Sequence, residues 1–316
     1  MEISNIVSGE KFQLQCELII GLKNDIAFNP LIRLMVNEGK IKFQDISELQ
    51  KMPDASYNNP KYIFIYTFHI KHFNTAKLFQ KFINKFVLLS HNCDDGIVSP
   101  EEINNIISCD KLIHWWSSNL NIPEIENGKL SYIPIGIANS QWQHGNSNHF
   151  KIIFENMNKL YRLDNTNYEI YKKNTIYFYF NVSTNKDARI NCARILKAKG
   201  LPNTCSFDIP HEKYLLLLST YKMAICPVGN GFDTHRLWEC FYCGVVPIVL
   251  NIPMHQTINK YIPIIILDKW DDFDMDKINE QYRQIMQSSA GDIYRDITKN
   301  KLLWFNYWQT RIFNNK

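Results

Sequence analysis

Long apolar runs are missing from this chain of 316 residues, and so are clusters of basic residues. No stretch approaches the roughly 18 consecutive apolar residues that a membrane-spanning helix needs. The first residues, MEISNIVSGEKFQLQ, lack the basic and then apolar pattern of a signal peptide. No grouping of lysine and arginine indicates a nucleic-acid surface. We therefore expect a cytoplasmic protein with no transmembrane segment and no nucleic-acid partner.

Cysteines are too scattered for a disulfide framework, because only eight are spread over the whole chain. Cys240 and Cys243 form a Cys-x-x-Cys pair, but the pair lies in an apolar segment and has no second pair near it. Zinc binding and redox chemistry stay open for this pair. We favour the interpretation that both are small buried side chains.

The composition is that of a globular protein. Hydrophobic residues make up 45% of the chain and charged residues 21%, which excludes an intrinsically disordered chain. The net charge of +4 suits an anionic ligand, but it suits an ordinary, slightly basic surface at least as well. The length allows two domains of ordinary size, each with a core of its own.

The most informative pattern runs from Met223 to Leu250. MAICPV is a short apolar run, and VVPIVL is apolar on both faces, as in a parallel strand that is covered on two sides. Between them, the Gly-Asn-Gly sequence at 229–231 permits a tight turn, and Asp233 or Thr234 is the candidate cap of a helix. Gly244 is expected to end that helix in the left-handed conformation. A strand, a helix N-terminus and a second strand make half of a nucleotide-binding unit.

Strands and helices alternate along the rest of the chain. Strands are expected at 16–21, 62–70, 86–90, 111–116, 130–137, 175–182 and 262–267, and helices at 75–84, 150–163 and 210–220, with helix starts near 99 and 188; residues 24–60 have no assignment. This alternation predicts an α/β protein with two Rossmann-like domains, each on a parallel sheet. We place the first domain at 1–160 and the second at 161–316. The aromatic C-terminal segment is expected to form a helix that returns to the first domain.

Polar residues gather at the carboxyl ends of four expected strands, which is the edge where open α/β sheets bind ligands. In the helix after the glycine turn, spacings of three and four place Arg236 and His235 near Glu239. One interpretation is a solvated ion pair worth roughly a few tenths of a kcal/mol. The other is a phosphate site at the helix N-terminus, with Glu239 accepting from a ribose or sugar hydroxyl. The glycine turn favours the second, because a diphosphate requires close approach of the backbone.

Arg189, His91 and Asp94 are further candidates, each with a plain structural alternative. Arg189 lies at the start of a helix, a position that suits a phosphate, but it could be an ordinary surface arginine. His91 and Asp94 follow a buried strand at a spacing that suits a base and its orienting partner. Aspartate and asparagine are also routine turn formers at strand ends.

Gln141, Trp142 and His144 combine an aromatic face with hydrogen-bonding groups. That mixture suits the C–H faces and hydroxyl groups of sugars. Trp142 could equally be ordinary packing between domains.

The sequence GNGFDTHRLWECFYCGVVPIVL resembles the nucleotide-sugar-binding signature of exostosin-like glycosyltransferases. That signature is roughly Gly-Asn-Gly-x-Asp-x-His-Arg-x-Trp-Glu, followed by Gly-x-x-Pro-Ile-Val. The segments SHNCDD, IPIGIANSQWQHGN and FNVSTNKDAR are similar to segments of bacterial and large-virus members of the group. The resemblance covers about 86 to 267. It is specific around His235 to Glu239 and weaker elsewhere.

The resemblance implies a glycosyltransferase of the GT-B type, with two Rossmann-like domains facing across a cleft. Such an enzyme moves a sugar from a UDP- or GDP-linked nucleotide-sugar donor to a hydroxyl group of an oligosaccharide or other glycan acceptor. No cofactor is expected, and no metal either: the Asp-x-Asp spacing of Asp272 and Asp274, which follows directly on Asp271, resembles a surface turn. If the sequence is viral, the expected location is the host cytoplasm.

The same resemblance implies a role for each matching residue. The second domain would bind the donor through Arg189, Asn230, Gly231, Asp233, His235, Arg236 and Glu239, with Glu239 at the ribose and Arg189 at the leaving diphosphate. The first domain would bind the acceptor through Asn92, Asn139, Gln141, Trp142 and His144. We expect inverting displacement with Asp94 as the first candidate for the catalytic base and His91 as the second. Cys93 stands where related sequences often have serine, which leaves the base assignment open.

Two other functions are weighed against this one. A different Rossmann enzyme lacks support, because no Gly-x-Gly-x-x-Gly motif with a downstream acid is present. A non-catalytic glycan- or nucleotide-sugar-binding protein of the same fold is disfavoured by the intact set of His235, Arg236 and Glu239. Retention of the anomeric configuration also stays open, because spacing does not show which face of the sugar is attacked.

Overall fold

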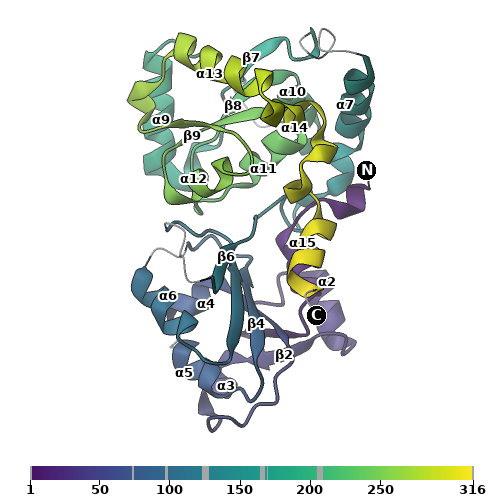
Figure 1. Ribbon diagram of the computed structural model, residues 1–316, viewed down its shortest axis with the longest axis vertical. Helices are drawn as coiled ribbons and strands as arrows, with labels where there is room; N and C mark the ends of the chain where they lie inside the picture. The colour runs from purple at the N-terminus through teal and green to yellow at the C-terminus, as the bar shows by residue number, and fades with distance from the viewer. Residues whose placement is uncertain are drawn as a thin grey trace. The chain divides into compact units, whose positions relative to one another are not determined.

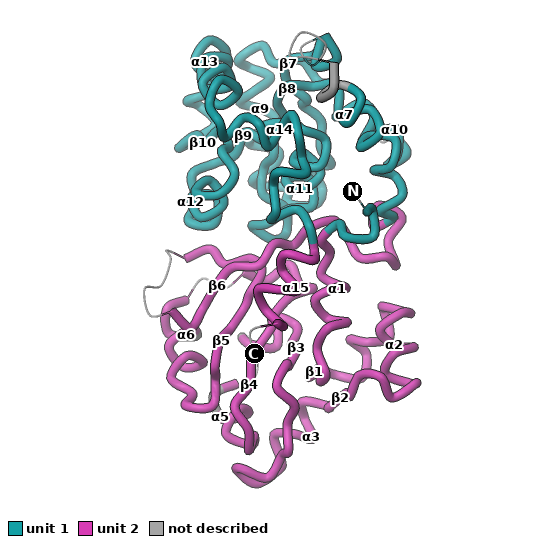
Figure 2. The backbone as a smooth tube through the Cα atoms, turned by 45° about the vertical axis from the view of Figure 1, so that its right-hand side comes forward, with its two compact units in different colours: residues 1–6, 146–304 teal, residues 7–145, 305–316 magenta. Residues whose placement is uncertain are grey.

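The computed structural model describes residues 2–72, 75–96, 99–122, 128–163, 168, 170–204 and 209–314. The chain forms two compact units, each assembled from two separate segments. Unit 1 comprises Met1–Ile6 and Asn146–Trp304, and unit 2 comprises Val7–Gly145 and Phe305–Lys316 (Figure 2). Each unit contains one parallel sheet, which confirms the predicted α/β class and is consistent with two Rossmann-like domains.

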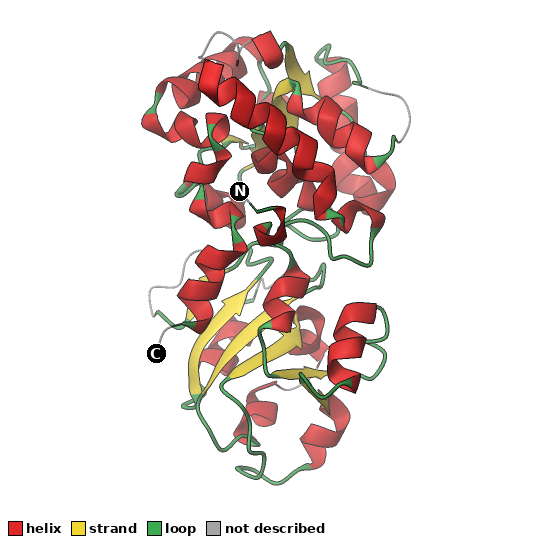
Figure 3. Ribbon diagram, turned by 90° about the vertical axis from the view of Figure 1, so that its right-hand side faces the viewer, coloured by secondary structure: helices red, strands yellow, loops and turns green. Residues whose placement is uncertain are grey.

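Unit 2 is built on a six-stranded parallel sheet in the order β2-β1-β3-β4-β5-β6, which forms one twisted surface (Figure 3). Its strands are β1 Leu18–Gly21, β2 Lys42–Asp45, β3 Tyr62–Tyr66, β4 Phe86–His91, β5 Leu112–Ser117 and β6 Leu130–Tyr132. The strand order reverses between β1 and β3. The carboxyl ends of these two strands are therefore the topological switch point, where open α/β sheets bind ligands.

Alternate residues of the unit 2 strands face opposite sides of the sheet, as the twofold period of a strand requires. The helices of this unit are α1 Gly9–Leu14, α2 Pro30–Asn37, α3 Ile46–Lys51, α4 Thr67–His72, α5 Thr75–Gln80, α6 Pro100–Ile107 and α15 Phe305–Phe313. Ile65, Leu88 and Trp115 join one apolar core with buried residues of α3, α5 and α6. This core fixes one face of the sheet against the helices.

The C-terminal helix α15 packs within unit 2, on the face of the sheet opposite that core. The rings of Phe305 and Phe12 lie 5.3 Å apart, and those of Trp308 and Trp116 lie 6.5 Å apart. The hydroxyl group of Tyr62 donates to the carbonyl of Phe313 at 2.9 Å. The aromatic tail is therefore buried against the sheet formed by the first part of the chain, as its composition led us to expect.

Unit 1 contains a four-stranded parallel sheet in the order β10-β9-β8-β7 (Figure 1). Its strands are β7 Asn174–Tyr177, β8 Tyr221–Ile225, β9 Val246–Leu250 and β10 Ile265–Leu267. Its α-helices are α7 Lys151–Leu163, α9 Lys186–Ala198, α10 His211–Ser219, α11 His235–Tyr242, α12 Pro253–Asn259, α13 Met275–Gln287 and α14 Asp292–Arg295. Short 3-10 helices include η1 Ile3–Asn5, η3 Ser147–Phe150, η4 Val182–Asn185 and η5 Trp270–Asp272.

The predicted strand–helix–strand pattern between 223 and 250 is confirmed as β8, α11 and β9. Gly244 has a φ of 62°, so the left-handed end of α11 is also confirmed. Cys240 and Cys243 are fully buried, and burial raises the pKa of both thiols. They serve as small apolar side chains, as we predicted.

Several expected strands are too long, and the clearest cases are 62–70, 130–137 and 175–182. Residues 175–182 form only the short strand β7 before the chain continues irregularly into η4. Residues 62–70 divide into β3 and α4, because a short apolar run does not distinguish a strand from a buried helix by its periodicity alone. Residues 130–137 form only the short strand β6; Ile133 and Ile137 are buried in an irregular segment. In that segment the amide of Ile137 donates to the carbonyl of Val7 at 2.9 Å, so its backbone is paired outside the strand ladder.

The domain boundary differs from the one predicted at 160 and 161. That position lies inside helix α7, whereas the compact units divide between Gly145 and Asn146. The physical reason is that α7 buries Phe154 and Met157 in unit 1, where the Phe154 ring lies 5.8 Å from that of Trp304. The predicted second domain also included α15, which belongs to unit 2.

Among the described residues, every helix is too short or too polar to cross a lipid bilayer.

Gly136 is expected to be a sensitive position for the stability of unit 2. Its φ is +67°, and a Cβ atom placed there would lie 2.2 Å from the carbonyl oxygen of Val7. Replacing Gly136 by alanine therefore adds a backbone clash to the cost of a left-handed alanine, and we expect a loss of about 3 kcal/mol or more of unfolding free energy. Gly39 is a matched control, because its φ is +69° and a Cβ atom added to it would meet no atom within 4 Å.

Gly39→Ala should cost about 1–2 kcal/mol, the strain of the left-handed conformation alone. Urea unfolding of both variants measures the difference. Equal losses at the two positions would contradict the crowding at Gly136.

Candidate functional site

The first part of the candidate site is the carboxyl edge of β7 and β8 in unit 1. The chain leaves β8 through the Val228–Gly231 turn and enters α11 at His235. The amide of Gly229 donates to the carbonyl of Gly231 at 3.1 Å, which closes the turn. The helix N-terminus that follows presents its first amides on the same edge, where they suit an anion.

Arg189 fixes this turn from α9. Its Nε atom donates to the carbonyl of Val228 at 3.0 Å, and Nη1 donates to the carbonyl of Asn181 at 2.8 Å. Asn185 donates from Nδ2 to the carbonyl of Gly229 at 2.7 Å. Burial, and then the positive charge of Arg236, lower the pKa of Arg189 to about 10, so the guanidinium is still charged at neutral pH. The structure thus brings Arg189 and the turn together.

Arg236 lies at the second position of α11, partly buried between two tyrosine rings. Its guanidinium carbon lies 5.5 Å from the ring centre of Tyr177 and 5.4 Å from that of Tyr214. Nη1 donates to the carbonyl of Tyr179, just beyond the end of β7. Because Arg189 and Arg236 repel each other, an anion placed near both would relieve that repulsion.

Glu239 is 6% exposed, and both of its carboxylate oxygens have partners on α10. His211 Nε2 lies 2.9 Å from Oε1, and the hydroxyl of Tyr214 donates to Oε2 at 2.9 Å. Burial alone would raise the pKa of this carboxyl. The hydrogen bond from His211 and the positive charges of His211, Arg236 and His235 together outweigh burial and lower the pKa below its usual range. The side chain is therefore a fixed carboxylate with lone pairs to spare for one further donor.

Asp233 has a different place from the one we expected. Its Oδ1 accepts a hydrogen bond from Nε1 of the buried Trp238 at 2.8 Å. Thr234 is the N-cap residue of α11, but no side chain caps the helix. The predicted cap position at Thr234 is therefore confirmed, but the side-chain hydrogen bond that we expected of Asp233 or Thr234 is not formed. The polar ring nitrogen of Trp238, once buried, needed an acceptor, and Asp233 supplies it.

The remaining donor-site candidates lie around this turn. Asn230 is exposed at its tip, Gly231 is buried within it, and His235 is half-buried at the start of α11. His235 contributes positive charge near Glu239. These residues therefore lie at the same turn and helix start as Arg236, as their sequence spacing indicated.

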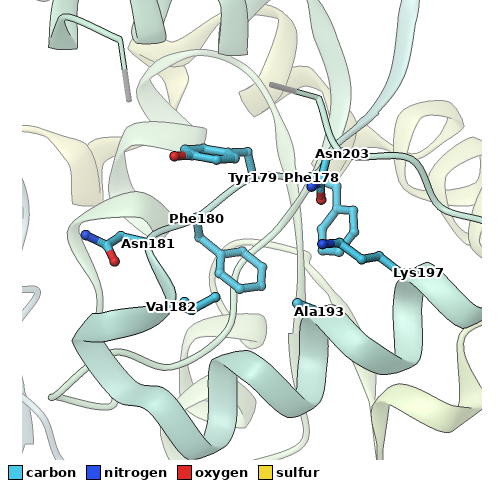
Figure 4. A pocket seen from close by; sticks show the side chains of 8 residues that line it. All are labelled: Phe178, Tyr179, Phe180, Asn181, Val182, Ala193, Lys197 and Asn203. Carbon is cyan, nitrogen blue, oxygen red and sulfur yellow. The ribbon is translucent and has the colours of Figure 1, made fainter. Parts of the chain in front are cut away.

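A hollow of about 280 Å³ lies beside the same edge, between the chain that follows β7 and helix α9 (Figure 4). Its lining residues are Phe178, Tyr179, Phe180, Asn181, Val182, Ala193, Lys197 and Asn203. Arg189, Arg236 and Glu239 do not belong to this lining. The backbone carbonyls of Tyr179 and Asn181 bind the two arginines instead, so the segment separates the hollow from the charged groups.

The second part of the candidate site is a polar network at the carboxyl edge of the unit 2 sheet. Asn139 Nδ2 donates to Asn92 Oδ1 at 3.1 Å, and Asn92 Nδ2 donates to Gln13 Oε1 at 2.7 Å. Gln13 Nε2 in turn donates to the hydroxyl of Tyr66 at 2.8 Å. Two of the predicted acceptor residues, Asn92 and Asn139, are therefore in direct contact. Asn92 has a φ of 59°, an αL conformation that asparagine tolerates.

A buried glutamate extends this network toward Gln141. Glu10 Oε2 accepts from Asn29 Nδ2 at 2.8 Å and from the hydroxyl of Ser140 at 2.7 Å. Asn29 Nδ2 also lies 3.2 Å from Gln141 Oε1. Sequence analysis missed Glu10 and Asn29. The Asn29-Pro30 pair was the only available signal, because asparagine followed by proline is typical of a helix start, but it says nothing of a ligand.

His91 is not accessible as a base. The ring is 1% exposed; Nε2 lies 3.1 Å from the carbonyl of Pro134, to which it donates, and Nδ1 accepts from the amide of Asn92 at 2.6 Å. The geometry gives His91 a structural role at the end of β4. Asp94 is exposed in the loop that follows. Between them, burial raises the pKa of Cys93 to about 11, so its thiol stays protonated at neutral pH.

Trp142 and His144 lie on the surface of unit 2. Trp142 is 56% exposed, and its ring stacks against that of His144 with an interplanar angle of 19° and centres 6.3 Å apart. An exposed, supported indole face is suited to the C–H face of a sugar. The role of Trp142 in acceptor binding stays a prediction.

The buried His69 and the partly buried Asp25 form a pair at the switch point of unit 2, and sequence analysis missed both. His69 Nε2 lies 2.6 Å from Asp25 Oδ2, which also accepts from the amide of Leu22. Asp25 follows β1 and His69 follows β3, the two strands between which the order reverses. No sequence signal joined them, because residues 24–60 had no assignment and His69 was placed in a strand.

We also looked for metal ligands and for matches to known proteins. Across the described ranges, histidine, cysteine, aspartate and glutamate side chains form no group of three or more that could hold a metal ion. The exposed Asp271 and Asp272 belong to η5, and Asp274 caps α13 by accepting from the amide of Lys277 at 3.0 Å. No family model matches the chain, and no curated protein matches it either.

Proposed function

We propose that the protein is a glycosyltransferase that moves a sugar from a nucleotide-sugar donor to a hydroxyl group of a glycan acceptor. The observation that carries the proposal is the carboxyl edge of β7 and β8. It combines two neighbouring guanidinium groups, a glycine turn at a helix N-terminus and a fixed, buried carboxylate. Cations and backbone amides suit a diphosphate, and a carboxylate acceptor suits the hydroxyl groups of a ribose.

In this proposal the donor is a UDP- or GDP-linked sugar bound by unit 1. Arg189 and Arg236 balance the charge that develops on the diphosphate as it leaves. Glu239 accepts a hydrogen bond from the ribose. Asn230 in the turn and His235 at the start of α11 belong to the same donor site. The positive charge is provided by side chains and helix amides, so the proposed reaction needs no metal.

The acceptor is bound by unit 2. Asn92, Asn139 and Gln141 offer amide donors and acceptors for sugar hydroxyl groups, and Trp142 with His144 offers an aromatic face. Asp94 is the proposed base. It takes the proton of the acceptor hydroxyl while the hydroxyl oxygen bonds to the anomeric carbon and the nucleoside diphosphate leaves with the electrons of the broken bond. Attack from the face opposite the leaving group inverts the anomeric configuration.

A thermal-shift screen against UDP-, GDP- and CMP-sugars tests the donor site. A ligand at about 100 times its dissociation constant adds roughly 2.7 kcal/mol of stability, which is readily measured as a rise in melting temperature. We expect a rise with a UDP- or GDP-sugar. No rise with any of the three classes would contradict the proposed function.

Hydrolysis of the bound donor distinguishes an enzyme from a binding protein. A transferase releases free nucleotide slowly when water takes the place of the acceptor, whereas a non-catalytic nucleotide-sugar-binding protein shifts the melting temperature and releases none. We expect turnover with inversion at the anomeric carbon. NMR of the released sugar measures its configuration.

A further inference from the structure

Four side chains of unit 1 form a continuous hydrogen-bonded chain from the surface to the buried Glu239. Asn146 Nδ2 lies 3.2 Å from His149 Nε2, and His149 Nδ1 lies 3.0 Å from His211 Nδ1. His211 Nε2 then lies 2.9 Å from Glu239 Oε1. His149 is half-buried on η3, and the His211 side chain is 9% exposed at the start of α10. We call His149 and His211 the histidine pair.

Only two arrangements of the protons are consistent with the donors and acceptors of this chain. The first arrangement has two neutral rings. A carboxylate only accepts, so His211 Nε2 carries a proton and donates it to Glu239. An amide NH₂ group donates, so His149 Nε2 accepts from Asn146 and the proton of His149 is on Nδ1. That Nδ1–H then donates to the bare Nδ1 of His211, and both rings are neutral.

In the second arrangement one more proton has been added. It binds to Nε2 of His149, the outer end of the chain, and the hydrogen bond from Asn146 breaks. The Nδ1 proton of His149 moves to Nδ1 of His211, which now carries both of its protons and a positive charge. His149 is again neutral, with its proton on Nε2. One proton has entered at the outer ring, and one positive charge has appeared at the inner ring beside Glu239.

The charges around the histidine pair allow one added proton but oppose two. Glu212 on α10 lies near His149, and Glu239 on α11 accepts from His211. Arg236 and His235 on α11 add positive charge near Glu239. Burial, and then the charge of His211, lower the pKa of His149. Two imidazolium rings with facing Nδ1–H groups would repel each other, so only one ring of the pair is charged at a time.

We propose that the histidine pair carries a proton to the side of Glu239, so that binding of a nucleoside diphosphate at this edge is accompanied by uptake of a proton. The inference rests on the proposed function, because it takes the ligand to be the anionic part of a nucleotide sugar. His149 and His211 are positioning residues: they act on the ligand through Glu239 and the local charge. Tyr214 holds the second oxygen of the carboxylate in place.

The sign of the effect follows from charge. An anion bound near Arg236 and Glu239 stabilises the form with a charged His211 and so raises the pKa of the pair. The extra affinity is therefore complete below the pKa of the unliganded pair and is lost as the pH rises through the raised pKa of the complex. We expect UDP or GDP to bind at least about fivefold more tightly at about pH 6 than at about pH 8.

The first experiment examines the pair without a ligand. The protein is labelled with ¹⁵N in its nine histidines, and long-range ¹H–¹⁵N spectra are recorded as the pH is lowered from about 8 to about 5. His149→Gln identifies the outer ring and supplies an amide that cannot carry the charge. We expect His211 to become charged while His149 stays neutral and moves its proton from Nδ1 to Nε2. A charge on His149 with a neutral His211, or an unchanged tautomer of His149, would overturn the proposal.

The second experiment measures proton uptake by calorimetry. UDP and GDP are titrated at about pH 6.5 in two buffers without phosphate, MES and Bis-Tris, whose heats of ionisation differ, so that the difference in binding heat reports the protons taken up. The terminal phosphate of the nucleotide also titrates near this pH, so the proton count of the histidine pair is the difference between two proteins that bind the same ligand. We expect wild type to take up a fraction of one proton more than His149→Gln does. His114→Gln, which changes a histidine of unit 2, should behave as wild type does.

The outcomes separate the two proposals. If the spectra show the shift to His211 but neither nucleotide binds, the relay stands and the proposed donor site is wrong. If a nucleotide binds and wild type takes up no more protons than His149→Gln does, the coupling of the pair to the ligand is wrong and the donor site stands.

Discussion

Sugar transfer is expected to fall by about 10²- to 10⁴-fold when Asp94 is replaced by asparagine, the range that a positioned general base contributes. Asparagine has the shape of aspartate but does not take a proton from the acceptor. Asp94 is exposed on unit 2, so the fold and the affinity of unit 1 for UDP or GDP should not change. Initial rates with a donor found in the thermal-shift screen, and calorimetry with the nucleotide alone, measure the two quantities.

Two other aspartates of unit 2 make this test specific. Asp110→Asn removes an exposed carboxylate from the same unit, and it should leave the rate unchanged. Asp25→Asn removes the carboxylate that is paired with His69 at the switch point. If Asp94→Asn keeps its rate and Asp25→Asn loses it, the base is Asp25. If Asp94→Asn loses nucleotide affinity instead, the assignment of a base to that loop is wrong.

Replacement of Glu239 by glutamine is expected to weaken UDP or GDP binding by about tenfold or more. A hydrogen bond to a charged group is worth roughly 1.5–3 kcal/mol, and each 1.4 kcal/mol is a factor of ten in affinity. Glutamine also turns an NH₂ group toward His211 or Tyr214, both of which donate to the carboxylate. Glu155→Gln, on the exposed face of α7, is the matched control in unit 1. Unchanged affinity in Glu239→Gln would move the donor site elsewhere.

The same variant should change how stability depends on pH. Because the folded protein lowers the pKa of Glu239 below 4.5, this carboxylate contributes stability at pH values above 4.5. The contribution is lost as the pH falls through the lowered, folded-state pKa. Wild type should therefore lose more unfolding free energy than Glu239→Gln as the pH drops below 4.5. Urea unfolding of both proteins at a series of acidic pH values measures this, and parallel curves would contradict it.

Sequence patterns predicted the parallel sheets because the central strands are buried on both faces and read as apolar runs. FVLLS and VVPIVL became β4 and β9 nearly residue for residue. The edge strand β2 could not be recognised, because Lys42–Asp45 is polar and only partly buried, and a strand of that kind has no distinctive period. Backbone pairing with β1 fixes its place in the sheet. That pairing cannot be predicted from the residue types of β2.

The candidate site was predictable where function depends on local spacing. Arg236, His235 and Glu239 lie on one helix, so their proximity followed from its period. The partners of Glu239 were not predictable, because His211 and Tyr214 come from another helix and meet it only through tertiary packing. Tertiary packing also decided the role of His91. Its spacing of three from Asp94 made it a plausible base, but in the fold both of its ring nitrogens form hydrogen bonds inside unit 2.

The path of the chain determines when each unit can be completed during synthesis. Residues 7–145 leave the ribosome before residues 146–304, yet α15, which covers Phe12 and Trp116, follows both. The nascent sheet of unit 2 therefore keeps an aromatic face uncovered while all of unit 1 is being translated. Unit 1 in turn includes residues 1–6, which are synthesised before the rest of that unit. Ile6, for example, pairs with Trp304 and can do so only after Trp304 has been synthesised. The aromatic core of unit 2 therefore cannot be completed before α15 has been synthesised.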